Sequence, residues 1–342
     1  MNKPIRVGIV GAGTNTREKH IPGLRKIEGV EIVSVVNSER ASSEQVARDY
    51  AIPTVYDSWE ELVASSDTDA IVIGTWPYLH CPVALAAIDA GKHLMCEARM
   101  AMDAVEARTM LTAAQNRPEL VTQIVPSPLT LHVDNVVKRL IREGYLGSIL
   151  AVEVRDTGGA FLDTESPLHW RQDVERSGVN VMSLGIWYET LMRWIGEARK
   201  VLSLGKVFVQ NRRDSKTGIT KRVGIPDHLV VMAEMVCGAQ ATFLLSQVTG
   251  GVRANEVLLF GSEATLRFSN NVLSGCRSNS ERFTEIPIPE EEAGVWHVEE
   301  EFINAIRGAG SITKTTFADG VKYMNFTEAV ARSIAEERAV YL

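Results

Sequence analysis

Residues 7–16 read Val-Gly-Ile-Val-Gly-Ala-Gly-Thr-Asn-Thr, and this run sets the architecture expected for the chain. It continues an apolar segment typical of a buried strand and ends where a helical pattern begins. Gly11 permits a tight turn, and Gly13 lets the backbone approach a pyrophosphate at the helix N-terminus, where unpaired N–H groups point. Thr16 stands at the third glycine position, so its side chain would space helix and strand differently or donate a hydroxyl to phosphate. The run predicts a dinucleotide-binding turn; a turn without a ligand is the alternative.

Short apolar runs and amphipathic helical patterns alternate through the rest of the first third of the chain. The apolar runs recur at residues 32–36, 70–74, 93–96 and 120–125. Strands that are apolar throughout and separated by helices are typical of a parallel, doubly wound sheet with helices on both faces. We therefore expect an α/β fold, with an N-terminal Rossmann domain over residues 1–126.

The pattern changes after Pro126-Ser127-Pro128. Strand-like segments such as 150–157, 201–210 and 239–248 alternate apolar and polar residues, which is typical of an antiparallel sheet with one face open to solvent or to a partner. A long helix is expected near residues 180–195. Residues 127–342 are thus predicted to form a C-terminal α+β domain with a mostly antiparallel open sheet, a common surface for oligomerisation.

Composition and charge narrow the class of partner. The 342 residues include 36 Lys and Arg against 43 Asp and Glu, a net charge of −7, and no basic block interrupts this acidic balance. We therefore expect a small-molecule substrate and neither nucleic acid nor a membrane surface as partner. The four cysteines lack metal or disulfide spacing, and the histidines form no ligand set, so no metal is expected. No signal-peptide pattern or membrane-spanning run is present, which favours a cytoplasmic protein.

The end of the second predicted strand bears on the choice of dinucleotide. NAD sites usually place a carboxylate there to bind the ribose 2′-hydroxyl, whereas this strand ends in Asn37-Ser38-Glu39-Arg40. Neutral Asn37 and Ser38 beside Arg40 would suit a 2′-phosphate, so we expect NADP rather than NAD. Glu39 argues for NAD if it faces the ribose, and an ordinary polar turn is the third interpretation.

Further stretches resemble the glucose–fructose oxidoreductase / inositol dehydrogenase / rhizopine-catabolism (Gfo/Idh/MocA) family. They are AIVIGTWPYLH at 70–80, AGKHLMCE at 90–97, HWRQD at 169–173 followed by Ser177-Gly178, and TEAVARS at 327–333. The resemblance extends over nearly the full length. It implies a Rossmann domain, a mostly antiparallel substrate domain, NAD(P) binding and oxidoreduction of a sugar or polyol, in a homodimer or homotetramer formed through the C-terminal sheet.

The resemblance also implies where a cofactor would lie. Trp76, Pro77 and His80 would line its nicotinamide side, and Glu97 would lie near the nicotinamide ribose. For His80, a purely structural role at the start of a helix is the alternative. The complete expected cofactor set is Gly11, Gly13, Thr14, Asn15, Thr16, Asn37, Ser38, Arg40, Thr75, Trp76, Pro77, His80 and Glu97.

The chain departs from the family where proton transfer is expected. The family carries Glu-Lys-Pro where this chain has Glu97-Ala98-Arg99, and its Asp and His, aligned on Gly185, become Ser183 and Trp187. Residues four apart share a helix face, so Ser183 and Trp187 are expected to point together toward the cofactor and to contact substrate. Trp187 would pack on the substrate or in the core. Asn180, where the family often has glycine, is the third expected substrate-binding residue.

A replacement acid–base group must then come from elsewhere. His169 is the preferred base because histidine titrates near neutrality, with a loop histidine bonded to backbone as the alternative. Arg99 could stabilise a developing alkoxide, and Tyr188 could relay a proton or be a core tyrosine. We expect an NAD(P)-dependent oxidoreductase. The alternatives are a redox-neutral enzyme that recycles a bound dinucleotide and a non-catalytic nucleotide-binding regulator.

Overall fold

The computed structural model describes residues 3–280 and 282–342, and the chain divides into two compact units. The first comprises Met1–Pro126 and His297–Met324, and the second comprises Ser127–Trp296 and Asn325–Leu342. The prediction of one continuous second domain over residues 127–342 therefore differs from the structure. Residues 297–324 belong to the first unit because helix α9 (Val298–Ile306) packs on helix α1 (Ile21–Arg25), and Thr315 pairs with Ile124 through both backbone hydrogen bonds.

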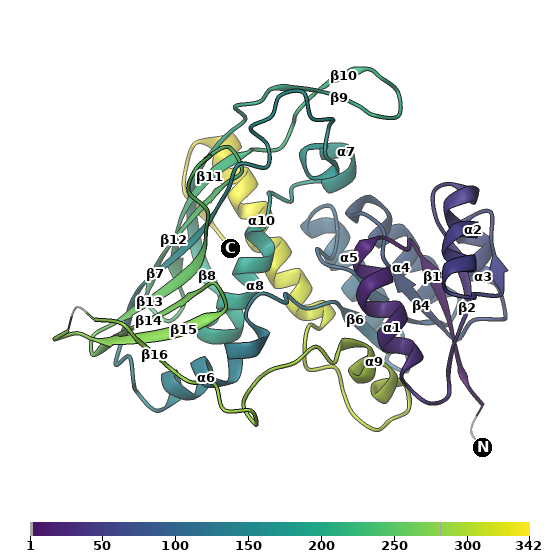
Figure 1. Cartoon of the computed structure of the whole chain (residues 1–342), viewed down its shortest axis with the longest axis horizontal. Helices are drawn as coiled ribbons and strands as arrows, with labels where there is room; N and C mark the ends of the chain where they lie inside the picture. Colours follow the sequence, from purple (N-terminus) through teal and green to yellow (C-terminus); the bar gives the residue numbers. More distant parts are fainter. Residues whose placement is uncertain (1–2, 281) are drawn as a thin grey trace. The chain divides into compact units, whose positions relative to one another are not determined.

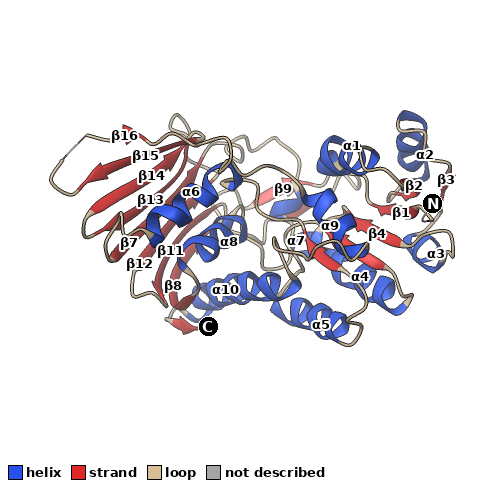
Figure 2. Cartoon of the chain, turned by 90° about the horizontal axis from the view of Figure 1, so that it is seen from below, coloured by secondary structure: helices blue, strands red, loops and turns tan. Residues whose placement is uncertain are grey.

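The first unit is built on a six-stranded sheet in the order β3-β2-β1-β4-β5-β6, with every pair parallel. Helices lie on both of its faces (Figure 2). Central strand β4 is apolar and buried throughout, and β1 is apolar except for Arg6 near its start, as a sheet covered on both sides requires. The predicted doubly wound Rossmann fold is confirmed. The strands are β1 Ile5–Val10, β2 Val30–Val36, β3 Thr54–Val55, β4 Ala70–Ile73, β5 His93–Cys96 and β6 Thr122–Ile124; the further helices are η1 Thr16–His20, α2 Arg40–Asp49, α3 Trp59–Ala64, η2 Pro77–Leu79, α4 His80–Asp89 and α5 Ala104–Gln115.

The second unit contains a nine-stranded sheet in the order β16-β15-β14-β13-β7-β12-β11-β8-β17. Its pairs are antiparallel except for β7 with β12, so the predicted mostly antiparallel sheet is confirmed. The strands are β7 Ile149–Thr157, β8 Ala198–Lys206, β11 His228–Met235, β12 Gln240–Ser246, β13 Ala254–Gly261, β14 Ala264–Ser269, β15 Val272–Arg277, β16 Thr284–Glu285 and β17 Val340–Tyr341, with a separate hairpin of β9 Asn211–Arg213 and β10 Thr220–Arg222.

Helices cover one face of the large sheet, which leaves the other face open (Figure 1). On the covered face, the Tyr188 ring stacks on Phe326 with 3.7 Å between ring centroids, and Phe326 also contacts Phe243 of β12. These contacts join two helices to the sheet. The helices of this unit are α6 Leu131–Arg142, η3 Trp170–Gln172, α7 Val174–Ser177, α8 Leu184–Ile195 and the C-terminal part of α10 Phe317–Glu336.

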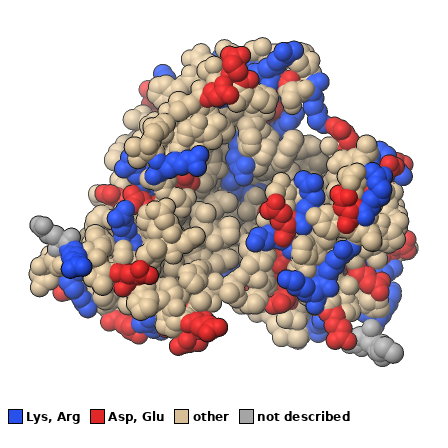
Figure 3. All heavy atoms as spheres, viewed as in Figure 1, with Lys and Arg blue, Asp and Glu red and all other residues tan. Residues whose placement is uncertain are grey.

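The open face carries exposed apolar side chains on neighbouring strands. Leu202 and Leu204 of β8 pair in register with Met232 and Val230 of β11, and all four are exposed. Self-association through this sheet stays a prediction. On the face of the molecule drawn in Figure 3, basic and acidic side chains are interspersed. Within residues 3–280 and 282–342, no helix combines the length and apolar character needed to cross a bilayer.

Candidate active site

In the glycine turn after β1, Gly11 packs so closely against the chain at Gly74 and Thr75 that neither Gly11 nor Gly74 has room for a side chain. Gly11 has φ +86°, in the left-handed region, and a Cβ there would lie 2.6 Å from the side chain of Thr75. A Cβ on Gly74 would overlap the carbonyl oxygen of Gly11. At Gly13, by contrast, a Cβ would meet only the Gly74 carbonyl oxygen, at 3.5 Å. The backbone is therefore tightly packed at Gly11, whereas Gly13 is much less crowded. A dinucleotide phosphate requires such access to the backbone.

Thr16 stabilises this turn from inside. Its side chain is buried, and its hydroxyl donates to the carbonyl oxygen of Gly11 at 3.2 Å. The expectation that this hydroxyl meets phosphate differs from the structure, because the Gly11 carbonyl already accepts it. The helix that follows contains the π-helical turn η1, and a changed spacing between this helix and β1 stays a prediction.

Asn37 fastens the glycine turn to the end of β2. Its Oδ1 accepts the N–H of Ala12 at 2.7 Å, and its Nδ2 donates to the hydroxyl of Ser42 at 3.0 Å. The Asn37 backbone N–H donates to Ser43 at 2.8 Å. The Asn37 carboxamide, which the sequence suggested for a 2′-phosphate, is therefore hydrogen-bonded to the backbone of the glycine turn.

Arg40 projects from the start of α2 and lies between two carboxylates. Its Nε donates to Glu44 at 2.9 Å and its Nη1 to Asp57 at 2.6 Å, and the side chain is half exposed. The charge expected to meet a 2′-phosphate is thus partly balanced by acidic neighbours. Ser38 and Thr14 are exposed.

A buried carboxylate–imidazole–carboxylate cluster lies beside the glycine turn, and the sequence did not reveal it. His20 is fully buried; its Nδ1 lies 2.5 Å from Glu299 Oε1, and its Nε2 lies 2.9 Å from Glu97 Oε1. Asn15 also donates to Glu97. Glu299 is pressed against α1, where a Cβ on Gly23 would lie 2.8 Å from its carboxylate. Glu97, expected near a ribose, is therefore first of all an acceptor for His20 and Asn15.

The charge state of His20 follows from these neighbours. Burial alone would lower the pKa of His20, but the hydrogen bonds and charges of Glu299 and Glu97 raise it to about 9. Burial would raise the pKa of Glu97, yet the bonded imidazolium holds it below its ordinary value. A pKa of about 9 keeps His20 predominantly protonated at neutral pH, beside the Glu97 and Glu299 side chains.

His80 and Arg99 connect the loops that follow β4 and β5. The His80 ring is fully buried, with Nδ1 2.8 Å from the carbonyl oxygen of Arg99 and Nε2 2.9 Å from that of Thr75. Burial lowers the pKa of His80, although these carbonyls favour the charged ring. The arrangement agrees with the structural alternative for His80. The Arg99 side chain is itself only 2% exposed, Pro77 is buried, and Trp76 is 37% exposed.

In the second unit, Ser183 and Trp187 share one partner. The Ser183 hydroxyl donates to Asp156 Oδ2 at 2.5 Å, and the Trp187 indole N–H donates to the same oxygen at 3.1 Å. The predicted common direction of these two side chains is therefore found. The Trp187 ring is fully buried, so it packs in the core of this unit and offers no face for stacking on a sugar.

The other candidates of the second unit occupy structural positions. His169 Nδ1 accepts the N–H of Arg171 at 3.2 Å, and partial burial with the charges of Arg171 and Arg212 lowers the pKa of His169 to about 4. Its accepting nitrogen is occupied and the ring does not titrate near neutrality, which removes the reason for choosing it as a base. The Tyr188 hydroxyl accepts the N–H of Ala198 at 2.8 Å in the core, and burial raises the pKa of Tyr188.

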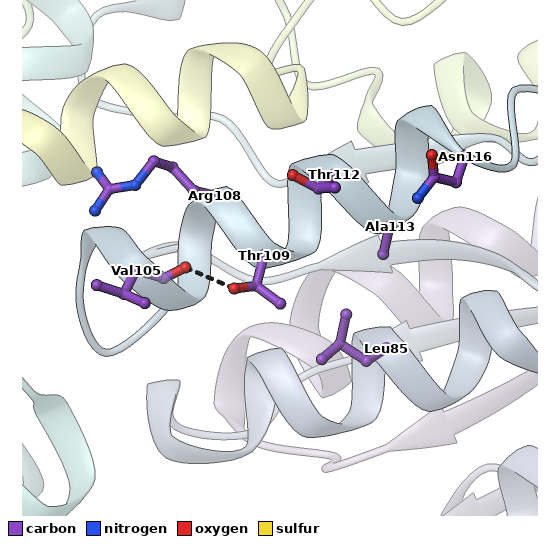
Figure 4. Close-up of a pocket in the computed structure, with 7 residues that line it drawn as sticks. All are labelled: Leu85, Val105, Arg108, Thr109, Thr112, Ala113 and Asn116. Carbon is purple, nitrogen blue, oxygen red and sulfur yellow. Dashed lines mark hydrogen bonds between the residues drawn. The ribbon is translucent and has the colours of Figure 1, made fainter.

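Asn180 does not project outward as expected. It is fully buried and donates to the carbonyl oxygen of Ser177 at 2.7 Å, which ties it to the end of α7. A shallow groove of about 480 Å³ lies between α4 and α5 (Figure 4). No residue expected to bind cofactor or substrate lines this groove. Among the described residues there is no group of three or more His, Cys, Asp or Glu side chains that could hold a metal ion.

Known families share both halves of this architecture. The family described as "Oxidoreductase family, NAD-binding Rossmann fold" matches residues 5–124, and the "GFO/IDH/MocA C-terminal domain" matches residues 135–267. The chain belongs to the Gfo/Idh/MocA oxidoreductase family. The resemblance found in the sequence is thereby confirmed, and with it an NAD-binding Rossmann fold.

Individual proteins resemble this chain over different shares of its length. Glucose-fructose oxidoreductase domain-containing protein 2 of Xenopus laevis is 26% identical over 277 residues, which are 80% of this chain and 70% of that protein. The 1,5-anhydro-D-fructose reductase of Ensifer adhaerens is 39% identical over 110 residues, 32% of this chain and 33% of that protein. The apo form of levoglucosan dehydrogenase has a TM-score of 0.87 at 20% identity, covering 100% of this chain and 99% of that one.

A pair of glycine substitutions separates binding from folding in the turn. Gly13→Ala should leave the melting temperature within about 2 °C, because its Cβ would make only an ordinary contact with the Gly74 carbonyl oxygen at 3.5 Å, yet weaken dinucleotide binding at least about tenfold. Gly74→Ala should destabilise the protein by about 1–3 kcal/mol, because its Cβ overlaps a backbone oxygen. Thermal unfolding and calorimetric titration measure both. Equal dinucleotide affinity in Gly13→Ala would contradict a phosphate at this turn.

The buried cluster predicts a particular pH dependence of stability. A histidine whose pKa rises from 6.5 to about 9 on folding stabilises the protein fully below pH 6.5, and this stabilisation is lost as pH rises through 9. This difference in pKa corresponds to a contribution of about 3 kcal/mol to the free energy of unfolding. Urea unfolding between pH 6 and 10 should show this decline in the wild type, and His20→Gln should lack it. His132→Gln, at an exposed position, is the control and should decline like the wild type. A full decline in His20→Gln would refute the assignment.

Proposed function

We propose that this family member is an NAD(P)-dependent dehydrogenase or reductase that acts on a sugar-like, polyol or keto substrate and prefers NADP. The observation that carries the proposal is the glycine turn, which is held closed by Gly11 and Gly74 and open in front of Gly13. Backbone N–H groups at this helix start suit a pyrophosphate. The bound dinucleotide would accept or supply the hydride, and the chain's own groups would orient the substrate and move the proton.

The substrate class is proposed from relatives and from the chemistry of the second unit. One structural neighbour is described as levoglucosan dehydrogenase in complex with NADH and L-sorbose, and one sequence relative as a 1,5-anhydro-D-fructose reductase. In this chain, the helix start at Ser183 carries a hydroxyl, an indole N–H and a carboxylate close together. The Ser183 and Trp187 donors both bond to Asp156 Oδ2, and a substrate hydroxyl suits the other oxygen of this carboxylate as an acceptor.

The NADP preference rests on the end of β2, where no carboxylate stands in place of Asn37 and an arginine follows. Arg40 would have to exchange part of its contact with Asp57 and Glu44 for the 2′-phosphate. A dianionic phosphate competes well with single exposed carboxylates because such surface pairs are individually weak.

Two substitutions on opposite sides of this contact test the preference. Arg40→Ala should weaken NADP binding roughly tenfold, the scale of one charge-assisted hydrogen bond, and change NAD binding less than about twofold. Asp57→Asn should strengthen NADP binding because it removes a competing carboxylate. Arg48→Ala, on the same helix, is the control. Calorimetric titration measures all four proteins with both dinucleotides; tighter binding of NAD by the wild type would contradict the proposal.

A single-turnover experiment tests the reaction itself. Protein is mixed with stoichiometric NADP or NAD and a panel of sugars, polyols and sugar lactones, and the absorbance of the reduced nicotinamide is followed. We expect a burst with at least one member of the panel. Dinucleotide binding without hydride transfer to or from any member would favour the regulator. Solvent deuterium in the product without net nicotinamide reduction would favour the redox-neutral enzyme.

A further inference from the structure

Asp156 stands where an apolar residue is expected. Along β7, Val152, Val154 and Asp156 occupy alternate positions and so face the same side of the sheet, and the two valines are fully buried. In register, Asp156 lies between Leu245 of β12 and Asn255 of β13. Placing a carboxylate on an apolar sheet face costs free energy unless hydrogen bonds compensate for the lost contact with water.

The residues at the family's catalytic positions both point to this carboxylate. Ser183 and Trp187 stand where the resemblance places the family's Asp and His, and both donate to Asp156 Oδ2. The two replacements therefore converge on a new acidic group, supplied by a strand instead of the helix. This coupling explains why an indole can stand at a position otherwise held by a titratable side chain.

The contact with Asp156 replaces the hydrogen bond that would normally cap the start of α8. Ser183 is the N-cap of α8, the position at which a serine hydroxyl usually accepts a backbone N–H, but it makes no capping bond and donates to Asp156 instead. The residue before it, Met182, has φ +44°, a left-handed conformation that is rare for a side chain of this size. Such local departures concentrate at functional sites.

A second aspartate of the same unit, Asp134, accepts hydrogen bonds from the same kinds of donor but has a purely structural role. Asp134 Oδ1 accepts the indole N–H of Trp194 and the hydroxyl of Thr130, each at 2.8 Å, while Oδ2 lies 2.9 Å from Arg193 Nε. Both oxygens of Asp134 are used, and the residue is fully buried. Asp156 has the same indole and hydroxyl donors on one oxygen, but it is partly exposed, and within residues 3–280 and 282–342 its Oδ1 makes no hydrogen bond.

We propose that Asp156 is the catalytic acid–base residue of this enzyme. In the oxidative direction, Asp156 Oδ1 takes the proton of the substrate hydroxyl as the C–H bond breaks. The carbon–oxygen double bond forms as the hydride leaves; a bound dinucleotide would accept that hydride at its nicotinamide, and Asp156 would pass the proton on to water. Ser183 and Trp187 act as positioning residues, because their bonds to Oδ2 turn Oδ1 toward the substrate. The inference rests on the proposed function. It assigns to Asp156 the acid–base role of the family residues that are replaced in this chain.

Variants of Asp156 test this role once the wild type shows hydride transfer. Asp156→Asn keeps a carbonyl oxygen that can accept from both Ser183 and Trp187 but cannot take the proton, so the single-turnover rate should fall about 10²–10⁴-fold. Dinucleotide affinity should stay within about twofold, since the first unit is unchanged. Asp156→Ala should be slow as well, and added formate should raise its rate in proportion to concentration by supplying the missing carboxylate. Trp187→Phe, which loses one donor, should lower the rate by a smaller factor.

Asp134→Asn is the matched control, because it alters a carboxylate with the same indole and hydroxyl partners. It should lower the melting temperature but leave the rate per folded molecule within about threefold of the wild type. Asp156→Asn with wild-type rate, or Asp156→Ala that formate does not restore, would overturn the inference while the proposed function stands. A wild type that transfers no hydride would overturn the proposed function, and this inference with it.

Discussion

The close approach of Gly11 to Gly74 is the constraint on which the first unit depends. These residues follow β1 and β4, the neighbouring strands at which the order of the sheet reverses. Crevices at such switch points, outside the carboxyl ends of parallel strands, are where this class of fold binds its ligands. Because neither position accommodates a Cβ, the two strand ends meet backbone to backbone, and Thr16 closes the contact with its hydroxyl. The geometry of the phosphate site is therefore built into the packing of the sheet.

Buried charge then fixes the surroundings of that turn. His20 joins the end of β5, through Glu97, to α9, through Glu299, which lies 279 residues from it in the sequence. Removing His20 would leave the Glu97 and Glu299 carboxylates close together without the cation between them, a costly state. This cluster explains why residues 297–324 return to the first unit after the long excursion of the chain through the second. It also holds Asn15 and Glu97 in place beside the helix start.

Local patterns predicted the architecture well because each depends on residues near one another in the chain. The apolar run before Gly11, the strand–helix alternation and the alternating polarity of β7, β8 and β12 all found their expected structures. The return of α9 was missed because a histidine and a glutamate far apart carry no joint signal. Arg99 and Tyr188 were singled out by their chemistry and His80 by the family resemblance, and burial gives all three packing roles that neither criterion shows.

Asp156 was the one group that the sequence could have indicated, since a carboxylate two residues after Val154 breaks an otherwise apolar inward face. Its role is the central claim, and the crystal structure of a ternary complex with reduced or oxidised dinucleotide and a polyol tests it most directly. The account predicts a substrate hydroxyl within hydrogen-bond distance of Asp156 Oδ1, with Ser183 and Trp187 still bonded to Oδ2. A substrate whose reacting hydroxyl is bonded to another side chain, with Asp156 out of contact, would contradict it.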